Sequence, residues 1–535
     1  MRHFLCVFFL AFSLACTRSQ PRASNSIRFQ ISGEPTTLDS VAATTEASHL
    51  VLFNLQEGLT RHDEWSNVVP ALAEKWSVSS EGRIYTFTLK DAKWSDGVSV
   101  RAQDFVFAWL RLLDPNRSSP NSELLGDVEN AESFHQGKAK ETAVGVKALD
   151  DRRLEVKLQH SSAHLLHRLA HPALAPQRQD IFDARPADYA DAPQLRSTGP
   201  YRLTQWTHGK RLLLEENPYF YGLKPFIPTV ELVVLPDASD ALHKYELGEL
   251  DCVSTLPISE IDRLRPRPDY RRDPLFEVSF ATFNVTAKPF DSREVRRAFV
   301  HSSPRKDVVA RSRLGALPAR AWIPSGLFGH EDHVGLDYNP ALAKTYLNKA
   351  GYRDPATFPA IRLTHEISDS QKISAETMQA NWRNILGVPT IDIQAFESKT
   401  YQGSVEETAP HIFRASLSTP FRDPQPFLDY FLSTNEWNLT GWKNSSYDSL
   451  VTAAGRSTNA KERLSIFRKV QRLLLEDEAV LIPLYQVRRE YLVRNALENL
   501  TMDGLGMIRF AQAKFVPERQ NDRSAGNIAA VVPSP

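Results

Sequence analysis

The sequence predicts a mixed α/β fold that is divided into several lobes. Segments with an apolar residue at every second position alternate with longer segments whose apolar residues recur every three or four positions, and these are the patterns of half-buried strands and amphipathic helices. Of the 535 residues, 42% are hydrophobic and 24% are charged, which is typical of a folded globular protein. Because a domain holds roughly 150 residues, we expect about two to four lobes.

Strands are expected at four places in the first half of the chain. Residues 84–90 carry Tyr85, Phe87 and Leu89 with polar residues between them, and residues 153–158 repeat this alternation, so each segment should bury one face. Residues 211–214 and 230–235 are nearly continuous apolar runs, which indicate more deeply buried strands.

Helices are expected between and after these strands. Asn339 and Pro340 form an N-cap followed by proline at the first helical position, so a helix should run to about Ala350 and end at Gly351. Residues 374–386 and 461–477 each place apolar residues along one face, and the first of these helices should end at Gly387. The stretch from 516 to 535 has the composition of a disordered tail.

Composition and motifs exclude several functions. Lys plus Arg and Asp plus Glu number 64 each, so no overall positive field exists to hold a nucleic acid. The sequence lacks the nucleophile elbow, the phosphate-binding loop and the dinucleotide-binding glycine motif, which are the usual anchors of hydrolase, phosphoryl-transfer and hydride-transfer activity. In the segment from His330 to His333 the histidines are three apart rather than four, and we interpret it as a solvated loop. We therefore expect neither an enzyme nor a cofactor.

Four histidines could form a metal site. His160, His164, His167 and His171 are spaced four, three and four apart, so an unbroken helix would align them along one stripe. However, the serines that follow His160 make better N-caps, and a proline follows His171, so the helix should begin after His160 and end before residue 172. Only His164 and His167 then share a helix, and we favour surface or core histidines over a metal site.

The first residues predict export from the cytoplasm. A polar start is followed by a twelve-residue apolar run from Phe4 to Ala15, which suits a signal peptide over residues 1–15 but is too short to span a bilayer. The sequence Ser-Leu-Ala-Cys at 13–16 resembles a bacterial lipoprotein cleavage box, in which Cys16 becomes the lipid-modified first residue and residues 16–26 link the anchor to the fold. Leu14 stands two residues before the cysteine instead of three, so ordinary cleavage with a free Cys16 is the alternative.

The remaining sequence offers no second membrane segment and no disulfide framework. No comparable apolar run follows Ser26, so nothing else is expected to cross the bilayer. If Cys6 is removed with the signal peptide and Cys16 carries lipid, Cys252 is the one cysteine left of the three in the sequence. The folded protein must then depend on its hydrophobic core.

Five sequence blocks occur in order along the chain. The longest, residues 71–115, combines a tryptophan-bearing turn, a strand, a Trp-Ser-Asp-Gly turn and an amphipathic helix, and its Trp76, Trp94 and Trp109 are expected as core anchors. The others lie at residues 34–39, at 197–201 with 216–221, at 283–298, and at 414–428 with Gly-Trp at 441–442. Together they resemble the peptide and nickel class, family 5, of extracytoplasmic solute-binding proteins of ABC importers, most closely the oligopeptide-binding lipoproteins.

The resemblance implies an α/β, two-lobed periplasmic-binding-protein-like fold with an extra inserted subdomain. On this basis lobe I comprises residues 27–50, 186–275 and 486–515, the inserted subdomain comprises residues 51–185, and lobe II comprises residues 276–485. Proteins of this class close over a ligand by a hinge motion and deliver it to a membrane permease. We therefore expect a monomer that captures oligopeptides or related peptide-like solutes; a surface lipoprotein with an adhesion or chaperone role is the alternative.

The resemblance also implies a binding site. Oligopeptide-binding proteins hold the peptide as an additional extended strand through backbone hydrogen bonds, which ignore the identity of its side chains. The positions that correspond to such a site in this chain are Glu34, Phe280, Ala281, Phe283, Arg414, Ser416, Leu417, Ser418, Pro420 and Trp442.

One position departs from the class. The block that begins at Arg414 usually reads Arg-x-Gly-Trp-x-x-Asp-Tyr-x-x-Pro, and its aspartate neutralises the α-ammonium group of the peptide, whereas this chain has Pro420 there. Proline offers neither a carboxylate nor a backbone donor. Either another carboxylate replaces the aspartate, with Glu34, Glu46 and Asp423 as candidates, or the ligand lacks a free amine, as do blocked or modified peptides, acylated or cell-wall fragments and non-peptide solutes.

Overall fold

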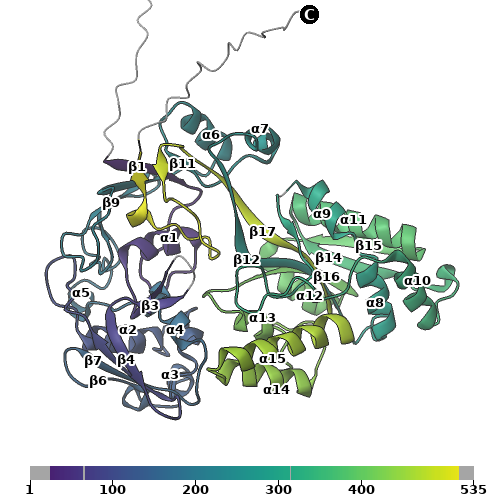
Figure 1. Ribbon diagram of the computed structural model, residues 1–535, viewed down its shortest axis with the longest axis horizontal. Helices are drawn as coiled ribbons and strands as arrows, with labels where there is room; N and C mark the ends of the chain where they lie inside the picture. Colours follow the sequence, from purple (N-terminus) through teal and green to yellow (C-terminus); the bar gives the residue numbers. More distant parts are fainter. Residues whose placement is uncertain (1–24, 64–66, 118, 314, 517–535) are drawn as a thin grey trace, which may run out of the picture.

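The chain folds into two lobes that share one sheet (Figure 1). The computed structural model describes residues 25–63, 67–117, 119–313 and 315–516. The strand order of this sheet is β15-β14-β16-β12-β17-β11-β1-β10-β9-β8, with β13 beside β17. The bounds are β1 (Ser26–Ile31), β8 (Tyr201–Thr207), β9 (Arg211–Glu216), β10 (Thr229–Val234), β11 (Cys252–Val253), β12 (Tyr270–Phe283), β13 (Leu317–Pro318), β14 (Ile361–Glu366), β15 (Ile391–Phe396), β16 (Ile412–Ser418) and β17 (Leu481–Val493).

Two long antiparallel strands connect the lobes. β12 and β17 contain 14 and 13 residues, and Figure 1 shows them running from the lobe that holds β1 to the lobe that holds β14. Their pairing extends from Tyr270 opposite Leu492 to Thr282 opposite Leu481, with register shifts between Pro274 and Val278 and between Ser279 and Phe280. Such irregularities bend a strand pair, so they mark the part of the sheet where its direction changes between the lobes.

Lobe I packs its strands against α1 (Glu46–Leu55) and the segments near the C-terminus. Thr45 caps α1 by accepting a hydrogen bond from the Ser48 amide. Burial of apolar side chains from both the first and the last parts of the chain explains why distant segments form one lobe; its cluster includes Ile27, Phe29, Leu52, Leu212, Leu232, Ile508 and Phe510. Three further short elements complete this lobe: α6 (Ala238–Glu246), α7 (Ile261–Leu264) and the pair of β18 (Leu497–Glu498) with β19 (Lys514–Phe515).

A separate four-stranded sheet lies below lobe I in Figure 1, in the order β4 (Ala73–Val78), β5 (Ile84–Leu89), β7 (Arg153–Lys157) and β6 (Val146–Ala148). The helix α2 (Ala102–Leu112) packs on it and buries Phe105, Val106 and Trp109. Trp94 and Trp109 are both fully buried, and their indole nitrogens donate to the Asp104 carboxylate and the Leu174 carbonyl, which confirms these two tryptophans as core anchors. The remaining elements here are β2 (Thr60–His62), β3 (Val68–Pro70), α3 (Ala131–His135), α4 (Leu165–Arg168) and α5 (Gln179–Ala184).

Lobe II surrounds its half of the large sheet with helices. One hydrophobic cluster forms around Phe283, Phe299 and Trp382, and a second forms around Phe280, Trp322 and Phe431. The bounds of the helices are α8 (Arg293–His301), α9 (Arg305–Ser312), α10 (Pro340–Lys349), α11 (Asp369–Leu386), α12 (Tyr401–Thr408), α13 (Gln425–Asp429), α14 (Ser445–Arg456) and α15 (Ala460–Arg472).

The expected helices are present, with changes at their ends. The Asn339 side chain accepts a hydrogen bond from the Leu342 amide and begins α10 as predicted. α11 begins five residues earlier than expected, because Ser368 caps it through the Gln371 amide. α15 stops at Arg472, and a π-helical turn, Leu473–Asp477, covers the rest of the predicted helix.

The strands are also found where they were expected, but one prediction about burial is wrong. β9 and β10 bury Leu212, Leu214, Val230 and Leu232, whereas the alternate residues of both strands are partly exposed. The reason is their position near the outer edge of the sheet, where β10, β9 and β8 end the strand order and only one face has a packed cover.

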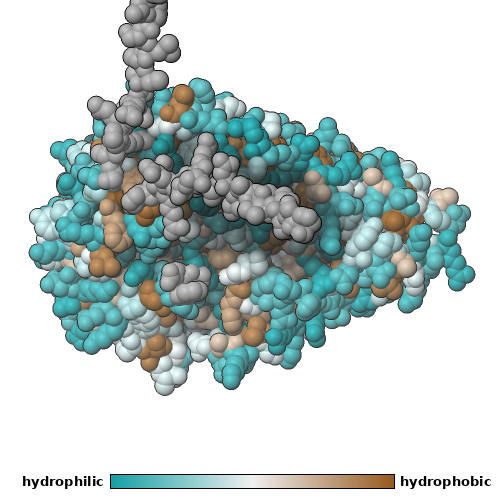
Figure 2. All heavy atoms as spheres, turned by 45° about the horizontal axis from the view of Figure 1, so that its top comes forward, coloured by the Kyte–Doolittle hydropathy of each residue, from teal (hydrophilic) through white to brown (hydrophobic). Residues whose placement is uncertain are grey.

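Figure 2 shows apolar side chains scattered over a mostly hydrophilic face of the molecule. In the described ranges, none of the helices combines the length and the apolar character needed to cross a membrane. Cys252 is a free, fully buried thiol whose pKa is raised by burial. The signal peptide, Cys16 and all but the first residue of the predicted tail lie outside the described residues.

Candidate functional site

A cavity of about 800 Å³ lies between the inserted subdomain and lobe II. Glu123, Leu124 and Arg168 from the inserted subdomain form one wall, and strand β16 with helices α12 and α13 forms most of the other. The lining side chains include Ser416, Leu417, Ser418, Pro420, Phe421, Tyr430 and Trp437. A volume of this size suits a small molecule or a short peptide segment.

The strand β16 presents an incomplete edge to this cavity. On one side it pairs with β12 over its full length, from Ile412 opposite Phe283 to Ser418 opposite Glu277. On the other side β14 reaches only Ile412 and Phe413, so no described strand lies beside residues 415–418. An unpaired strand edge offers backbone donors and acceptors to an additional strand.

The hydrogen bonds of Arg414 show which residues of β16 have backbone amides and carbonyls that face away from β12. The Tyr401 hydroxyl donates to the Arg414 carbonyl at 2.7 Å and lies 3.2 Å from the Arg414 amide, which donates to it. α12 carries Tyr401 on the side of β16 away from β12, and backbone groups alternate along an antiparallel strand. The amides and carbonyls of Ser416 and Ser418 therefore face the same way as those of Arg414, toward the open edge.

The structure places four of the expected site residues in the cavity wall: Ser416, Leu417, Ser418 and Pro420. Ser416, Ser418 and Pro420 are exposed. Arg414 is fully buried beneath this wall, where its Nη2 donates to Ser279 Oγ at 2.8 Å and its Nη1 donates to the Gln371 carbonyl at 3.2 Å. Arg414 therefore holds β16 to β12 and α11.

The expected aromatic residues lie deeper. Phe280 packs edge-on against Trp322 at 4.9 Å between ring centroids, and Phe283 stacks on Phe290 at 4.9 Å. Trp442 packs against Tyr447 at 5.0 Å. Phe280, Phe283 and Ala281 are fully buried and Trp442 is 5% exposed, so all four belong to the core behind the cavity rather than to its wall.

The three carboxylates considered as replacements already have partners. Glu34 accepts hydrogen bonds from the Trp206 indole and the Gly209 amide, each at 2.9 Å, and His208 Nδ1 lies at the same distance. Burial opposes ionisation of Glu34, but these hydrogen bonds lower its pKa overall. Glu46 pairs with Arg489 at 2.8 Å. The carboxylate of Asp423 makes a buried ion pair with Arg463 at 2.6 Å.

Five charged residues in the cavity wall were not expected from the sequence: Glu123, Arg168, Glu277, Glu366 and Asp429. Asp429, at the end of α13, and Arg168, at the end of α4, both line the cavity. Asp429 is the residue immediately after the block at 414–428, so its position could have indicated it as a candidate site residue. Arg168 stands among the four histidines, and nothing in the sequence connects that segment with lobe II.

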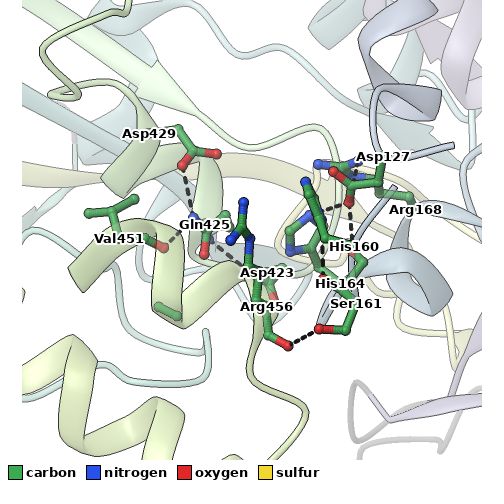
Figure 3. A network of polar contacts seen from close by, with 12 residues as sticks. Asp127, His160, Ser161, His164, Arg168, Asp423, Gln425, Asp429, Val451 and Arg456 are labelled. Atoms are coloured by element: carbon green, nitrogen blue, oxygen red, sulfur yellow. Dashed lines mark hydrogen bonds and ion pairs between the residues drawn. The ribbon is translucent and has the colours of Figure 1, made fainter. Parts of the chain in front are cut away.

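The inserted subdomain touches lobe II beside this cavity (Figure 3). Ser161 Oγ donates to the Arg456 carbonyl and the Ala163 amide donates to the Gly455 carbonyl, each at 2.9 Å. Phe421 belongs to the hydrophobic cluster of the inserted subdomain although it lies in the loop after β16. Its ring stacks on His164 at 5.8 Å and lies 5.4 Å from the Arg168 guanidinium.

The four histidines do not form one stripe. α4 covers only Leu165–Arg168, with His164 at its N-cap. His164 pairs with Asp127 at 3.3 Å, His167 Nδ1 lies 3.1 Å from His62 Nε2, and His171 accepts from the Ala173 amide. Burial lowers the pKa of His164, of His167 and of His171, the last to about 3. No group of three or more potential metal ligands occurs in the part of the chain that the structure describes.

Replacing Phe421 with alanine should weaken the contact between the lobes. The ring is 5% exposed, and removing a buried phenylalanine ring costs about 3–5 kcal/mol in a core. We expect a loss of about 2–4 kcal/mol in denaturant unfolding, together with a larger radius of gyration in small-angle X-ray scattering of the unliganded protein. Phe421→Leu is the matched control and should lose much less. An unchanged radius and unfolding midpoint in Phe421→Ala would contradict the assignment.

Comparison with known proteins gives one family over most of the chain. The family model described as bacterial extracellular solute-binding proteins, family 5, middle region, matches residues 67–438. The dipeptide-binding protein DppE of Bacillus subtilis is 29% identical over 489 residues, which is 89% of each chain. The oligopeptide-binding protein OppA of the same organism is 28% identical over 514 residues, which is 93% of this chain and 94% of the relative.

Solved structures of similar proteins share the fold of this chain. The unliganded open form of the periplasmic murein tripeptide binding protein MppA has a TM-score of 0.84 at 25% identity, covering 92% of this chain and 98% of that chain. The Haemophilus influenzae OppA complex with the peptide RPPGFSPFR has a TM-score of 0.72 at 23% identity, covering 93% and 100%.

Proposed function

The chain belongs to the bacterial extracellular solute-binding proteins of family 5, and we propose that it captures oligopeptides or related peptide-like solutes between its lobes and delivers them to the permease of an ABC importer. It has no turnover of its own in this proposal. The observation that carries it is the open edge of β16, which lines the cavity between the inserted subdomain and lobe II.

The open edge explains why a peptide is the proposed ligand. Backbone hydrogen bonds from Ser416 and Ser418 would bind any extended peptide, since every residue of the peptide carries the same backbone groups. The side chains of the peptide would then project into the cavity, where water can mediate their contacts. B. subtilis DppE and OppA are named for dipeptide and oligopeptide binding, which supports the same class of ligand here.

Closure about the connecting strands would complete the site. We divide the chain into lobe I (27–50, 186–275 and 486–515), the inserted subdomain (51–185) and lobe II (276–485), and β12 and β17 cross between the lobes near these limits. Hinge closure needs only a few backbone positions to change, and the register shifts in this strand pair supply an irregular segment. The likeness to an unliganded open form agrees with a protein that closes on its ligand.

The N-terminus would hold the protein at the membrane. We propose that residues 1–15 are a signal peptide, that Cys16 is lipid-modified, and that residues 16–26 link this anchor to β1, so that a monomer works on the outer side of a bacterial membrane. The family description places its members outside the cell. Mass spectrometry of the mature protein would test the lipid, because ordinary cleavage leaves Cys16 unmodified.

The proposed function is tested by removing one outward backbone donor. Ser416→Pro deletes the amide that faces the open edge while leaving the hydrogen bonds to β12, and proline is tolerated on an edge strand. We expect peptide binding to weaken about tenfold or more in calorimetry. Ser416→Ala is the matched control, since it keeps the amide, and should bind within about twofold of the wild type.

Ligand-induced stabilisation gives an independent measurement. A ligand at about 100 times its Kd should stabilise the protein by about 2.7 kcal/mol. A thermal-shift panel in which no peptide, peptide fragment or metal complex raises the melting temperature would count against a binding protein of this kind. Mass spectrometry of material that co-purifies with the protein would identify the natural ligand.

A further inference from the structure

The walls of the cavity carry unbalanced charge. Among the described lining residues there are four carboxylates, Glu123, Glu277, Glu366 and Asp429, and one basic side chain, Arg168. With all of them ionised, the lining has a formal charge of −3. The whole chain is neutral by the same count, so the negative charge is a local property of this cavity.

The protein does not neutralise these carboxylates itself. Asp429 accepts a hydrogen bond from the side-chain Nε2 of Gln425 at 2.8 Å, and Glu366 accepts one from Ser398 Oγ at 3.2 Å. Across the described residues, none of the four lining carboxylates has a Lys, Arg or His nitrogen within 4 Å. The Arg168 guanidinium forms an ion pair with Asp127 at 3.2 Å, so its charge already has an anionic partner.

Asp429 is the member of this set that lies nearest to Pro420 and Phe421 along the chain, on the helix that follows them. Loss of hydration raises its pKa to about 6, and the hydrogen bond from Gln425 and the charge of Arg168 offset this effect only in part. Burial also raises the pKa of Glu277 on β12. In both groups the charge of an arginine, Arg168 for Asp429 and Arg489 for Glu277, offsets the effect of burial on the pKa only in part.

We propose that the ligand of this cavity is positively charged, and that Asp429 is the counter-ion that takes the place of the aspartate missing at Pro420. The inference rests on the proposed function and adds the charge of its substrate class. A low-dielectric cleft with one sign of charge concentrates ligands of the opposite sign. The cation is an ammonium or guanidinium group, which the α-amine or the side chains of a peptide can supply.

Calorimetry with matched tetrapeptides tests this proposal and separates the two sources of charge. The peptides are Ala-Lys-Lys-Ala, Ala-Gln-Gln-Ala and Ala-Glu-Glu-Ala, each with a free and an acetylated amine, and the protein is the full mature chain freed of bound ligand. We expect the lysine peptide to bind about tenfold or more tightly than the glutamine peptide, and the glutamate peptide to bind most weakly. Acetylation that leaves the lysine preference intact assigns the cation to side chains; acetylation that abolishes binding of the lysine and glutamine peptides alike assigns it to the amine.

Asp429→Asn is the decisive variant, and Glu407→Gln is its control. Glu407 is an exposed carboxylate on α12 that does not line the cavity, so both changes remove one charge from lobe II. We expect Asp429→Asn to weaken binding of the preferred cationic peptide about tenfold and Glu407→Gln to change it less than about twofold. Equal effects of the two variants would overturn the inference, and so would wild-type affinities that change neither with the lysine content of the peptide nor with acetylation of its amine.

A failure of the proposed function gives a different result. If no peptide of any charge binds or stabilises the wild type, the function itself is wrong and the inference falls with it. If the glutamine peptide binds, Ser416→Pro weakens it and charge has no effect, then the function stands and only the inference is overturned.

The pH dependence of binding supplies a second readout. The groups that influence Asp429 are Gln425, Arg168, Asp423 and Asp127, and Asp429 in turn influences Tyr447. Because the pKa of Asp429 is raised to about 6, its carboxylate becomes neutral as the pH falls from about 7.5 to about 5. Affinity for the cationic peptide should fall over this range in the wild type, and this loss should be much smaller in Asp429→Asn. A pH profile that the variant leaves unchanged would contradict the role of Asp429.

Discussion

Replacing Arg463 with methionine should lower the free energy of unfolding by about 3–5 kcal/mol, because it leaves a buried carboxylate without its partner. Arg463 donates to both oxygens of Asp423, at 2.7 and 2.6 Å. The two side chains are 7% and 2% exposed, so water cannot replace the lost partner. Denaturant unfolding at neutral pH measures the effect.

The pH dependence of this variant has a definite sign. Burial alone would raise the pKa of Asp423, but the ion pair with Arg463 holds that pKa below its ordinary value of 3.8. In the wild type the contribution of the pair is therefore complete above the ordinary value and is lost as the pH falls through the lowered pKa. In Arg463→Met burial acts without the pair, so lowering the pH from about 7 to about 5 should reduce the deficit relative to the wild type.

A double variant separates the ion pair from the loss of packing. Asp423→Asn with Arg463→Met keeps the oxygen that accepts from the Gln425 amide at 2.9 Å and removes both charges. We expect the double variant to be more stable than Arg463→Met alone by about 2 kcal/mol or more. A single variant that is as stable as the double variant would show that the loss comes from packing and not from the unpaired carboxylate.

The sequence was most informative where local chemistry decides the structure. Asn339 followed by Pro340 was sufficient to begin α10, because an N-cap and a first-turn proline act on the adjacent backbone. The alternation in residues 84–90 and 153–158 was sufficient for β5 and β7, which lie side by side in one sheet. The end of α11 at Gly387 follows from the left-handed conformation of that glycine, with φ of 70°.

The sequence was least informative about groups that meet across long separations. Phe421 packs with the core of the inserted subdomain, and no local pattern connects it with His164. No local pattern connects Arg463 with Asp423 either. The ion pair between them occupies the Asp423 carboxylate, so this carboxylate is not available to a ligand. The apolar pattern also overestimated the burial of β9 and β10. It shows which residues are apolar, but not whether other elements pack on the second face of the sheet.

The likeness to known solute-binding proteins indicated strand β16, which lines the cavity, but not the charges around it. Ser416, Leu417, Ser418 and Pro420 line the cavity, whereas Phe280, Ala281, Phe283 and Trp442 support it from the core. Asp429 was missed because the sequence does not show which carboxylates line the cavity. Glu34 was expected at the site, but its carboxylate oxygens already form hydrogen bonds with Trp206, His208 and Gly209.

Introducing a carboxylate at Pro420 should strengthen binding of free-amino oligopeptides. The residue is exposed and lines the cavity, and Thr419 before it keeps its own contacts, with its hydroxyl donating to the Phe421 carbonyl at 2.6 Å. In Pro420→Asp we expect a gain of about 2–4 kcal/mol, the range for restoring one member of a charge pair that becomes desolvated when the lobes close.

Acetylating the peptide should cancel this gain, because it removes the positive charge and keeps the backbone hydrogen bonds of the added strand. Calorimetry of the wild type and the variant with both forms of one peptide is a four-measurement cycle that isolates the new pair. Pro420→Asn is the matched control for the loss of the rigid proline backbone and should give little gain. If Asn equals Asp, or if the acetylated peptide keeps the gain, the improvement comes from the loop rather than from the charge, and position 420 does not face the amine. If the wild type already loses affinity on acetylation, Asp429 is the carboxylate to replace first, since Glu34, Glu46 and Asp423 are each held by other groups.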